Sequence, residues 1–388
     1  MFPKPKSINF KKYTTFAAKS EFMLKEKIIS GIQQIGIGVS NVHQAWNWYR
    51  EHFGMDIRIF EDAAVAELML PYTGGEPRKR HAALAMNLQG GGGFEIWQYV
   101  GRTPEAPKNE ILAGDLGIYI AKIKSKNVKE TYSRFKEKNL NISELLTGPD
   151  GKVHFFVKDP YKNIFQIVDG YSWFKLDNKK STGAAFGAII GVSDIEKAME
   201  LYSGILGYDT VIYDKSGSFE DLKSLPGGDK TFRRVLLKHS KPRLGSFSKI
   251  LGPSEMELIQ VIDRKPEQIF KNRFWGDLGF IHLCYDIKGM EALRNECKSK
   301  GFPYTVDSNN TLKTDTFDMG EAAGHFAYIE DPDGTLIEFV ETDKIPIMKK
   351  FGWYLDLRKR DPRKALPDWI LRTLKYSSVT EKDLMQKN

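Results

Sequence analysis

The feature that most constrains the fold of this chain is an internal repeat. Residues 35–54 align without a gap with residues 188–207, and the matching apolar residues recur every four positions, on one helical face. Residues 113–139 align in the same way with residues 275–301 around a shared Gly-Asp-Leu-Gly. All four segments read as a strand followed by an amphipathic helix. A fold built from four related units is therefore expected.

The helices of the first pair have recognisable ends. Asn41 and Asp194 stand directly before the helical pattern, and Gly54 and Gly207 stand where it ends. Asn and Asp accept hydrogen bonds from the first backbone N–H groups of a helix, whereas Gly adopts the left-handed conformation that ends many helices. We expect the two helices to lie between these residues.

Hairpins follow the second and the fourth helix. The segments VKDPYKNIFQIVDG, at 157–170, and IEDPDGTLIEFVE, at 329–341, both read as a strand, an Asp-Pro turn and a strand. The last strand carries Gln166 in the first copy and Glu338 in the second. The layout is therefore kept twice, but the carboxylate only once.

The four units, each a strand, a helix and three further strands, cover residues 30–110, 113–175, 183–265 and 275–345. Their order resembles the vicinal oxygen chelate superfamily, which includes glyoxalase I, extradiol dioxygenases and bleomycin-resistance proteins. The resemblance implies an α+β fold of four βαβββ units that form two cupped mixed-sheet modules around a small-molecule site.

The resemblance covers about residues 30–345 and explains neither end of the chain. The expected parts are a basic N-terminal extension at 1–29, a first module at 30–175, a second module at 183–345 and a C-terminal extension at 346–388. In the last part, aromatic and aliphatic residues predict a strand or loop and a short helix capped near Asp368. This extension is expected to pack on the body, with a homodimer contact as the alternative.

Metal ligands of the family lie on the first and last strands of each unit. The positions that match in the four units are, in chain order, Gln34 and Glu95, Ile120 and Gln166, Gly187 and Glu257, and His282 and Glu338. If the first unit pairs with the fourth, one cup receives the Gln/Glu/His/Glu set of glyoxalase I, namely Gln34, Glu95, His282 and Glu338. If neighbouring units pair, Glu257 joins His282 and Glu338 instead.

The ligand types indicate the chemistry. Two carboxylates, an imidazole and an amide oxygen suit one divalent ion per chain, such as Zn, Ni, Co, Mn or Fe. Such an ion can stabilise an enediolate while Glu338 or Glu95 moves a proton. The resemblance thus implies a glyoxalase-like lyase or isomerase that acts on a small 2-oxo or 2-hydroxy-carbonyl substrate.

Two other functions stay open from the sequence. A ring-cleaving or 2-oxo-acid dioxygenase needs two His and one carboxylate, and Gly187 stands at one of those His positions. A metal-free protein that binds or sequesters a small molecule is the other alternative. Glutathione is not favoured as a substrate component, because Gly38, Tyr99 and Leu278 replace the residues that hold it in glutathione-dependent members.

Charge and composition limit the partners. The net charge of +8 comes from the ends: residues 1–29 hold seven Lys and two Glu, and residues 349–375 hold nine basic and three acidic residues. The body between them is slightly acidic, so no nucleic-acid groove is expected. No apolar run predicts a membrane span, and the two cysteines, Cys284 and Cys297, fit a reducing compartment. A cytoplasmic location is expected.

Overall fold

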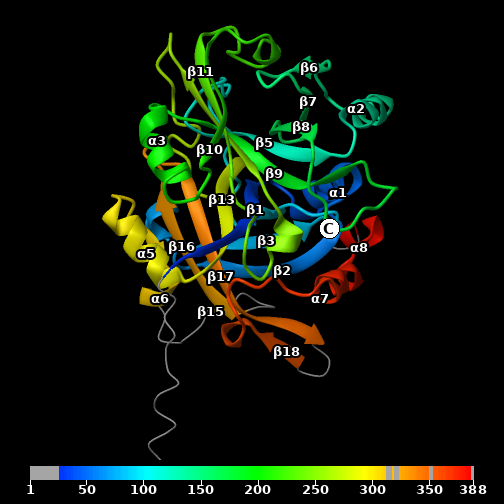
Figure 1. Ribbon diagram of the computed structural model, residues 1–388, viewed down its shortest axis with the longest axis vertical. Coiled ribbons are helices and arrows are strands. Elements are labelled where there is room, and N and C mark those ends of the chain that lie inside the picture. Colours follow the sequence, from blue (N-terminus) through cyan, green and yellow to red (C-terminus); the bar gives the residue numbers. More distant parts are fainter. Residues whose placement is uncertain (1–25, 312–316, 319–322, 349–352, 386–388) are drawn as a thin grey trace, which may run out of the picture.

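The computed structural model describes residues 26–311, 317–318, 323–348 and 353–385. It contains two curled mixed sheets, which lie one above the other in Figure 1. The strands of the first sheet, in the order β14-β16-β17-β13-β1-β4-β3-β2, are Val306–Asp307, Ala323–Glu330, Leu336–Met348, Gly279–Lys288, Ile28–Gly38, Gly93–Tyr99, Arg78–Met86 and Ile57–Ala66, with β15 (Phe317–Asp318) beside β16 and β18 (Trp353–Asp356) beside β17. Those of the second, in the order β10-β11-β12-β9-β5-β8-β7-β6, are Thr210–Gly217, Phe232–Lys238, Glu255–Val261, Thr182–Gly191, Gly117–Ser125, Ile164–Asp169, Val153–Lys158 and Leu146–Thr147.

The units pair crosswise in these sheets. In the first sheet β1 of the first unit runs antiparallel to β13 of the fourth, and in the second sheet β5 of the second unit runs antiparallel to β9 of the third. Figure 1 shows this as blue β1 beside yellow β13. The predicted α+β fold of four units is confirmed, and each sheet takes one unit from each half of the sequence. The boundaries of the modules at 30–175 and 183–345 stay a prediction.

Helices α1 (Val42–Phe53), α2 (Val128–Glu137), α3 (Ile195–Tyr202) and α5 (Met290–Ser299) follow the first strands of the four units. The two N-caps are confirmed, because Asn41 accepts a hydrogen bond from the backbone N–H of Gln44 and Asp194 accepts one from that of Lys197. Helix α1 ends at Gly54, in the left-handed conformation.

One large core contains side chains of both sheets and of all four of these helices. Tyr49 and Phe53 of α1 are fully buried there and contact Phe94 of the first sheet and Phe165 of the second. The rings of Phe94 and Phe165 themselves lie 5.6 Å apart. Apolar burial of this kind supplies about 1.5–3 kcal/mol for each large side chain, so the core holds the two sheets together.

The connection before β4 also joins the sheets. The backbone N–H of Gly92 donates to the carbonyl of Ala185 in β9, and a Cβ on Gly91 would lie only 2.6 Å from the same oxygen. Gly91 also has a φ of +113°, which side chains rarely allow. Glycine is therefore required at this crossing.

The C-terminal extension packs on the edge of the first sheet, as Figure 1 shows for α7 (Asp368–Arg372) beside β2. Leu366, Ile370 and Leu371 are buried against Ile57 and neighbouring core residues. The short helix predicted to begin near Asp368 is confirmed: Pro367 occupies the cap position without a side-chain hydrogen bond, and Asp368 is the first helical residue and pairs with Lys249. The remaining helical segments are η2 (Leu70–Tyr72), η3 (Glu220–Leu222), α4 (Ser248–Leu251), α6 (Ser308–Thr311), η5 (Leu357–Lys359), η6 (Thr373–Ser377) and α8 (Glu381–Met385).

Residues 1–25 of the basic N-terminal extension lie outside the described residues. Within the described part of the chain, no helix has both the length and the apolar character that a membrane crossing needs. The cytoplasmic location and the homodimer through the C-terminal extension stay predictions.

Candidate metal centre

The four residues that crosswise pairing predicts as ligands lie on four neighbouring strands in the middle of the first sheet. Glu338 is on β17, His282 on β13, Gln34 on β1 and Glu95 on β4. The strand register brings them to one level, because Gly36 of β1 pairs with both His282 and Glu95. Four residues that are far apart in the sequence, from Gln34 to Glu338, thus lie together on adjacent strands.

Their side chains converge on one point. His282 Nε2 lies 3.2 Å from Glu95 Oε2 and 3.1 Å from Glu338 Oε2. Gln34 Nε2 donates to the same two oxygens at 3.3 and 3.4 Å. The ligand atoms of Glu95, His282 and Glu338 all lie within 4.8 Å of one another. The structure therefore brings all four predicted residues together, and metal binding by them stays a prediction.

The electrostatics of this group favour a cation. His282 is fully buried, and the side chains of Glu95 and Glu338 are only 13% and 9% exposed. Burial alone lowers the pKa of His282, but Glu338 and Glu95 outweigh that effect and raise it to about 9. Gln34 Oε1 is buried without a hydrogen-bond partner among the described residues, although it is a ligand atom for hard and borderline ions. These side chains fit a divalent ion.

His282 is held by close packing. Its ring stacks on Trp275 with centroids 6.1 Å apart and meets Tyr328 edge-on at 5.7 Å. On the third side lies Gly36, where an added Cβ would be 2.4 Å from His282 Cε1. Gly36 is therefore required for the imidazole to reach the two carboxylates.

We expect Gly36→Ala to displace His282 and weaken metal binding more than it weakens the fold. Overpacking of this kind costs about 1–3 kcal/mol, and the ring is the group that must move. Metal affinity by competition with a chromophoric chelator, together with the thermal unfolding midpoint, measures the two effects. An unchanged affinity in a folded variant would contradict this role of Gly36.

A cluster of buried hydrophobic residues packs beside the four residues. We call this face of the first sheet the first cup, and its buried hydrophobic residues are Met69, Ala82, Trp97, Tyr99, Trp275, Ile281, Val306 and Tyr328. The indole N–H groups of Trp97 and Trp275 are buried and have no hydrogen-bond partner among the described residues. Strand alternation places Trp97 on the face of Glu95, but Trp275 precedes β13 and only the fold brings it to His282.

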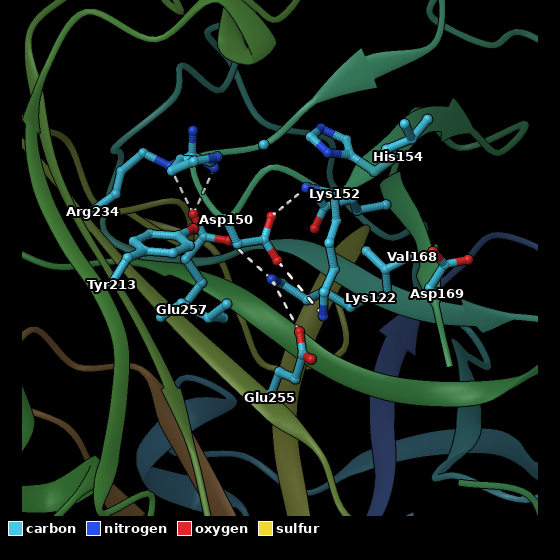
Figure 2. A pocket seen from close by; sticks show the side chains of 15 residues that line it. Lys122, Asp150, Lys152, His154, Val168, Asp169, Tyr213, Arg234, Glu255 and Glu257 are labelled. Atoms are coloured by element: carbon cyan, nitrogen blue, oxygen red, sulfur yellow. Dashed lines mark hydrogen bonds and ion pairs between the residues drawn. The ribbon is translucent and has the colours of Figure 1, made fainter. Parts of the chain in front are cut away.

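The equivalent face of the second sheet, the second cup, has a different character (Figure 2). Both carboxylate oxygens of Glu257 are occupied by cations of the protein itself, with Lys122 Nζ at 2.9 Å and Arg234 Nε at 2.7 Å. Arg234 also pairs with Asp221. Burial alone would raise the pKa of the Glu257 carboxyl, but Arg234 and Lys122 hold it far below its usual range. The negative charge of Glu257 is therefore balanced by cationic side chains within the second cup.

The other matched positions of the second cup offer little to a metal. Ile120 and Gly187 have no ligand atom in their side chains, and Gln166 supplies only an amide. Glu257, which neighbour pairing would bring to His282, lies instead on β12 in the second sheet. The ligand set expected from neighbour pairing is not assembled.

A pair of substitutions separates the two cups. Glu95→Ala should weaken metal binding by more than about tenfold, because it removes one of two carboxylates in the first cup. Glu257→Ala should leave metal affinity nearly unchanged but lower the free energy of unfolding by about 3–5 kcal/mol, because Arg234 and Lys122 lose a buried partner. Calorimetric metal titration and urea unfolding measure these effects, and the reverse order of affinities would contradict the assignment.

Comparisons with known proteins agree with this fold. The family model described as Glyoxalase/Bleomycin resistance protein/Dioxygenase superfamily matches residues 31–167 and 187–339. No curated protein sequence matches the chain. Glyoxalase I from Zea mays is 15% identical over 81% of this chain and 92% of its own, with a TM-score of 0.50.

A candidate dioxygenase from Bacillus subtilis is 12% identical over 92% of this chain and 98% of its own, with a TM-score of 0.51. Identities this low show a shared fold and not a shared activity. The family model, however, covers most of both halves of the sequence. The chain belongs to the Glyoxalase/Bleomycin resistance protein/Dioxygenase superfamily.

Proposed function

We propose that this protein is a divalent-metal-dependent lyase or isomerase that moves a proton on a small 2-oxo or 2-hydroxy-carbonyl substrate. The observation that carries the proposal is the convergence of Glu95 and Glu338 on His282 Nε2, with Gln34 beside them. Carboxylates close to one cation-favouring point can serve both as ligands and as bases.

A divalent ion held by Gln34, Glu95, His282 and Glu338 would polarise a substrate carbonyl and so acidify the neighbouring carbon. Glu338 takes the proton from that carbon, and Glu95, after it has gained a proton from solvent, gives this proton to the product; Glu338 then releases its proton to solvent. Without the ion, the Gln34 amide donates through Nε2 to both carboxylates, and it would turn to present Oε1 when it holds the ion. Tyr328 and Trp275 fix the ring of His282 from two sides.

The lining of the first cup suggests how the substrate is oriented. Trp97 and Trp275 pack edge to face with ring centroids 4.7 Å apart, and their N–H groups, which have no partner in the described parts of the chain, are donors for substrate oxygens. Hydrophobic residues such as Ile281 and Val306 pack beside these two rings. This combination suits a small substrate that has two neighbouring oxygens at one end and an apolar or aromatic group at the other.

We expect Trp97→Phe to raise KM about five- to tenfold, because a neutral hydrogen bond contributes about 1 kcal/mol and the ring itself is retained. Trp173→Phe is the matched control, since the Trp173 indole donates to the carbonyl of Gly170 outside the first cup. Steady-state kinetics of both variants checks the prediction. Equal effects of the two substitutions would contradict a substrate contact by Trp97.

To test the proposal, the full-length protein is loaded with Zn, Ni, Co, Mn or Fe, one metal at a time. Each form is then incubated in deuterated water with a panel of 2-oxo and 2-hydroxy-carbonyl compounds. Deuterium incorporation next to a carbonyl, followed by NMR, is the expected result. Oxygen consumption without exchange would indicate a dioxygenase instead. Tight binding of a compound by metal-free chain, without exchange, would indicate a binding protein.

A further inference from the structure

A second group of metal-binding side chains lies on the first sheet, on the face opposite the first cup. It consists of His43 in the first turn of α1, Glu61 on β2 and His81 on β3. The strand register fixes the face: Glu61 pairs with Ala83, which is buried in the large core under α1. His81 precedes Ala83 by two residues and therefore shares its face.

The three side chains are already close to the spacing of a metal site. His43 Nε2 lies 2.8 Å from Glu61 Oε1, and His81 Nε2 lies 3.4 Å from the same oxygen. In a tetrahedral zinc site with bonds of about 2.0–2.2 Å, neighbouring ligand atoms are about 3.3 Å apart. One of the two distances fits already, and the other requires an opening of about half an ångström.

The surroundings hold these groups in place, and His81 is the most exposed of the three. The side chains of His43 and Glu61 are each only 8% exposed, whereas that of His81 is 23% exposed. Arg58 Nη1 lies 3.6 Å from Glu61 Oε2 and so orients the carboxylate through the oxygen that the histidines do not use. The imidazole rings meet edge-on with centroids 5.2 Å apart, and both present Nε2 to the same oxygen.

We propose that His43, Glu61 and His81 form a second metal site that binds Zn²⁺, with a water molecule in the fourth position. Two imidazoles and one carboxylate are a donor set that zinc prefers, and an open fourth position on the exposed side suits a three-ligand site. The ion would tie the start of α1 to the β2–β3 hairpin at the edge of the first sheet. It adds to the one ion inferred for the first cup, so the expected content becomes two per chain.

The test removes the first cup from the measurement. Full-length chain carrying His282→Ala is titrated with Zn²⁺ against a chromophoric chelator, with circular dichroism as the check on folding. One equivalent of bound zinc is expected. Adding His81→Gln should weaken that zinc by at least about 100-fold, whereas adding His325→Gln should not change it. His325 is the matched control, because it also lies near a carboxylate, 3.6 Å from Asp343, but has no second histidine beside it.

Two further measurements test whether the bound zinc lies at His43, Glu61 and His81. In chain with an intact first cup, His81→Gln should lower the zinc content from two equivalents to one. X-ray absorption of zinc bound to the His282→Ala chain should show two imidazole ligands. A folded His282→Ala chain without zinc, or zinc binding unaffected by His81→Gln, would overturn the proposal and leave a hydrogen-bonded His–Glu–His cluster. Either outcome is independent of whether the first cup is catalytic.

Discussion

Replacing His282 by Ala is expected to remove the metal ion of the first cup and all metal-dependent turnover. His282 is the only imidazole among the four predicted ligands, and its Nε2 lies within 3.2 Å of both carboxylates. Without it, Glu95 and Glu338 face each other with only the Gln34 amide between them. Three oxygen ligands bind borderline ions such as Zn²⁺ or Ni²⁺ much more weakly than a set with an imidazole.

Elemental analysis after dialysis measures this loss as a fall of one metal equivalent relative to the unmodified chain. His154→Ala is the matched control, because His154 is also buried but lies in the second cup beside Asp221. That variant should keep the metal of the first cup. Full occupancy in a folded His282→Ala chain would contradict the assignment of His282 as a ligand.

The sequence predicts the units of this fold because their signals are local. Asn41 and Asp194 cap helices through bonds to residues three positions away, and strand alternation places Glu95 and Trp97 on one face. Pairing of the units is different. Each first strand offers the same apolar pattern to any partner, so the choice between neighbours and crosswise pairing depends on contacts far apart in the sequence.

The contact between Gly36 and His282 is one such case. Only when β1 lies beside β13 does the missing side chain at Gly36 leave room for the imidazole. The sequence shows Gly36 merely as a glycine in an apolar strand. Its requirement follows from a distance that exists in one pairing of the units.

The ion pairs of Glu257 in the second cup could not be predicted from the sequence either. The resemblance assigns Ile120, and not Lys122, to the ligand position of β5, yet the Lys122 side chain reaches Glu257 across β9. Arg234 reaches the same carboxylate from β11. Long flexible side chains can neutralise a charge two strands away, and alternation gives only the face on which they lie.

His43 and His81 were missed for a related reason. The repeat assigns them no ligand position, because they lie on the helix side of the sheet and not in a cup. His81 reads as part of a basic strand start, and His43 as an ordinary residue of a first helical turn. Their meeting at Glu61 depends on how α1 packs over the β2–β3 hairpin, which local patterns do not specify.

Glu338→Gln is expected to abolish turnover while the fold and part of the metal affinity remain. The substitution copies Gln166, which stands at the matched position of the second cup, so the strand tolerates an amide there. An amide oxygen can still bind a metal, but it cannot accept a proton at neutral pH. A loss of a positioned base lowers kcat by about 10²–10⁴-fold.

Solvent-hydrogen exchange at the substrate carbon, followed by NMR, separates this loss from a loss of binding. Glu341→Gln is the matched control on the same strand: Glu341 lies three residues further, on the opposite face, and accepts a hydrogen bond from the backbone N–H of Met290. It should keep full exchange. If Glu95→Gln abolishes exchange and Glu338→Gln does not, the two carboxylates have the opposite roles. Undiminished exchange in both would show that neither is the base, and the proton transfer proposed for the first cup would be wrong.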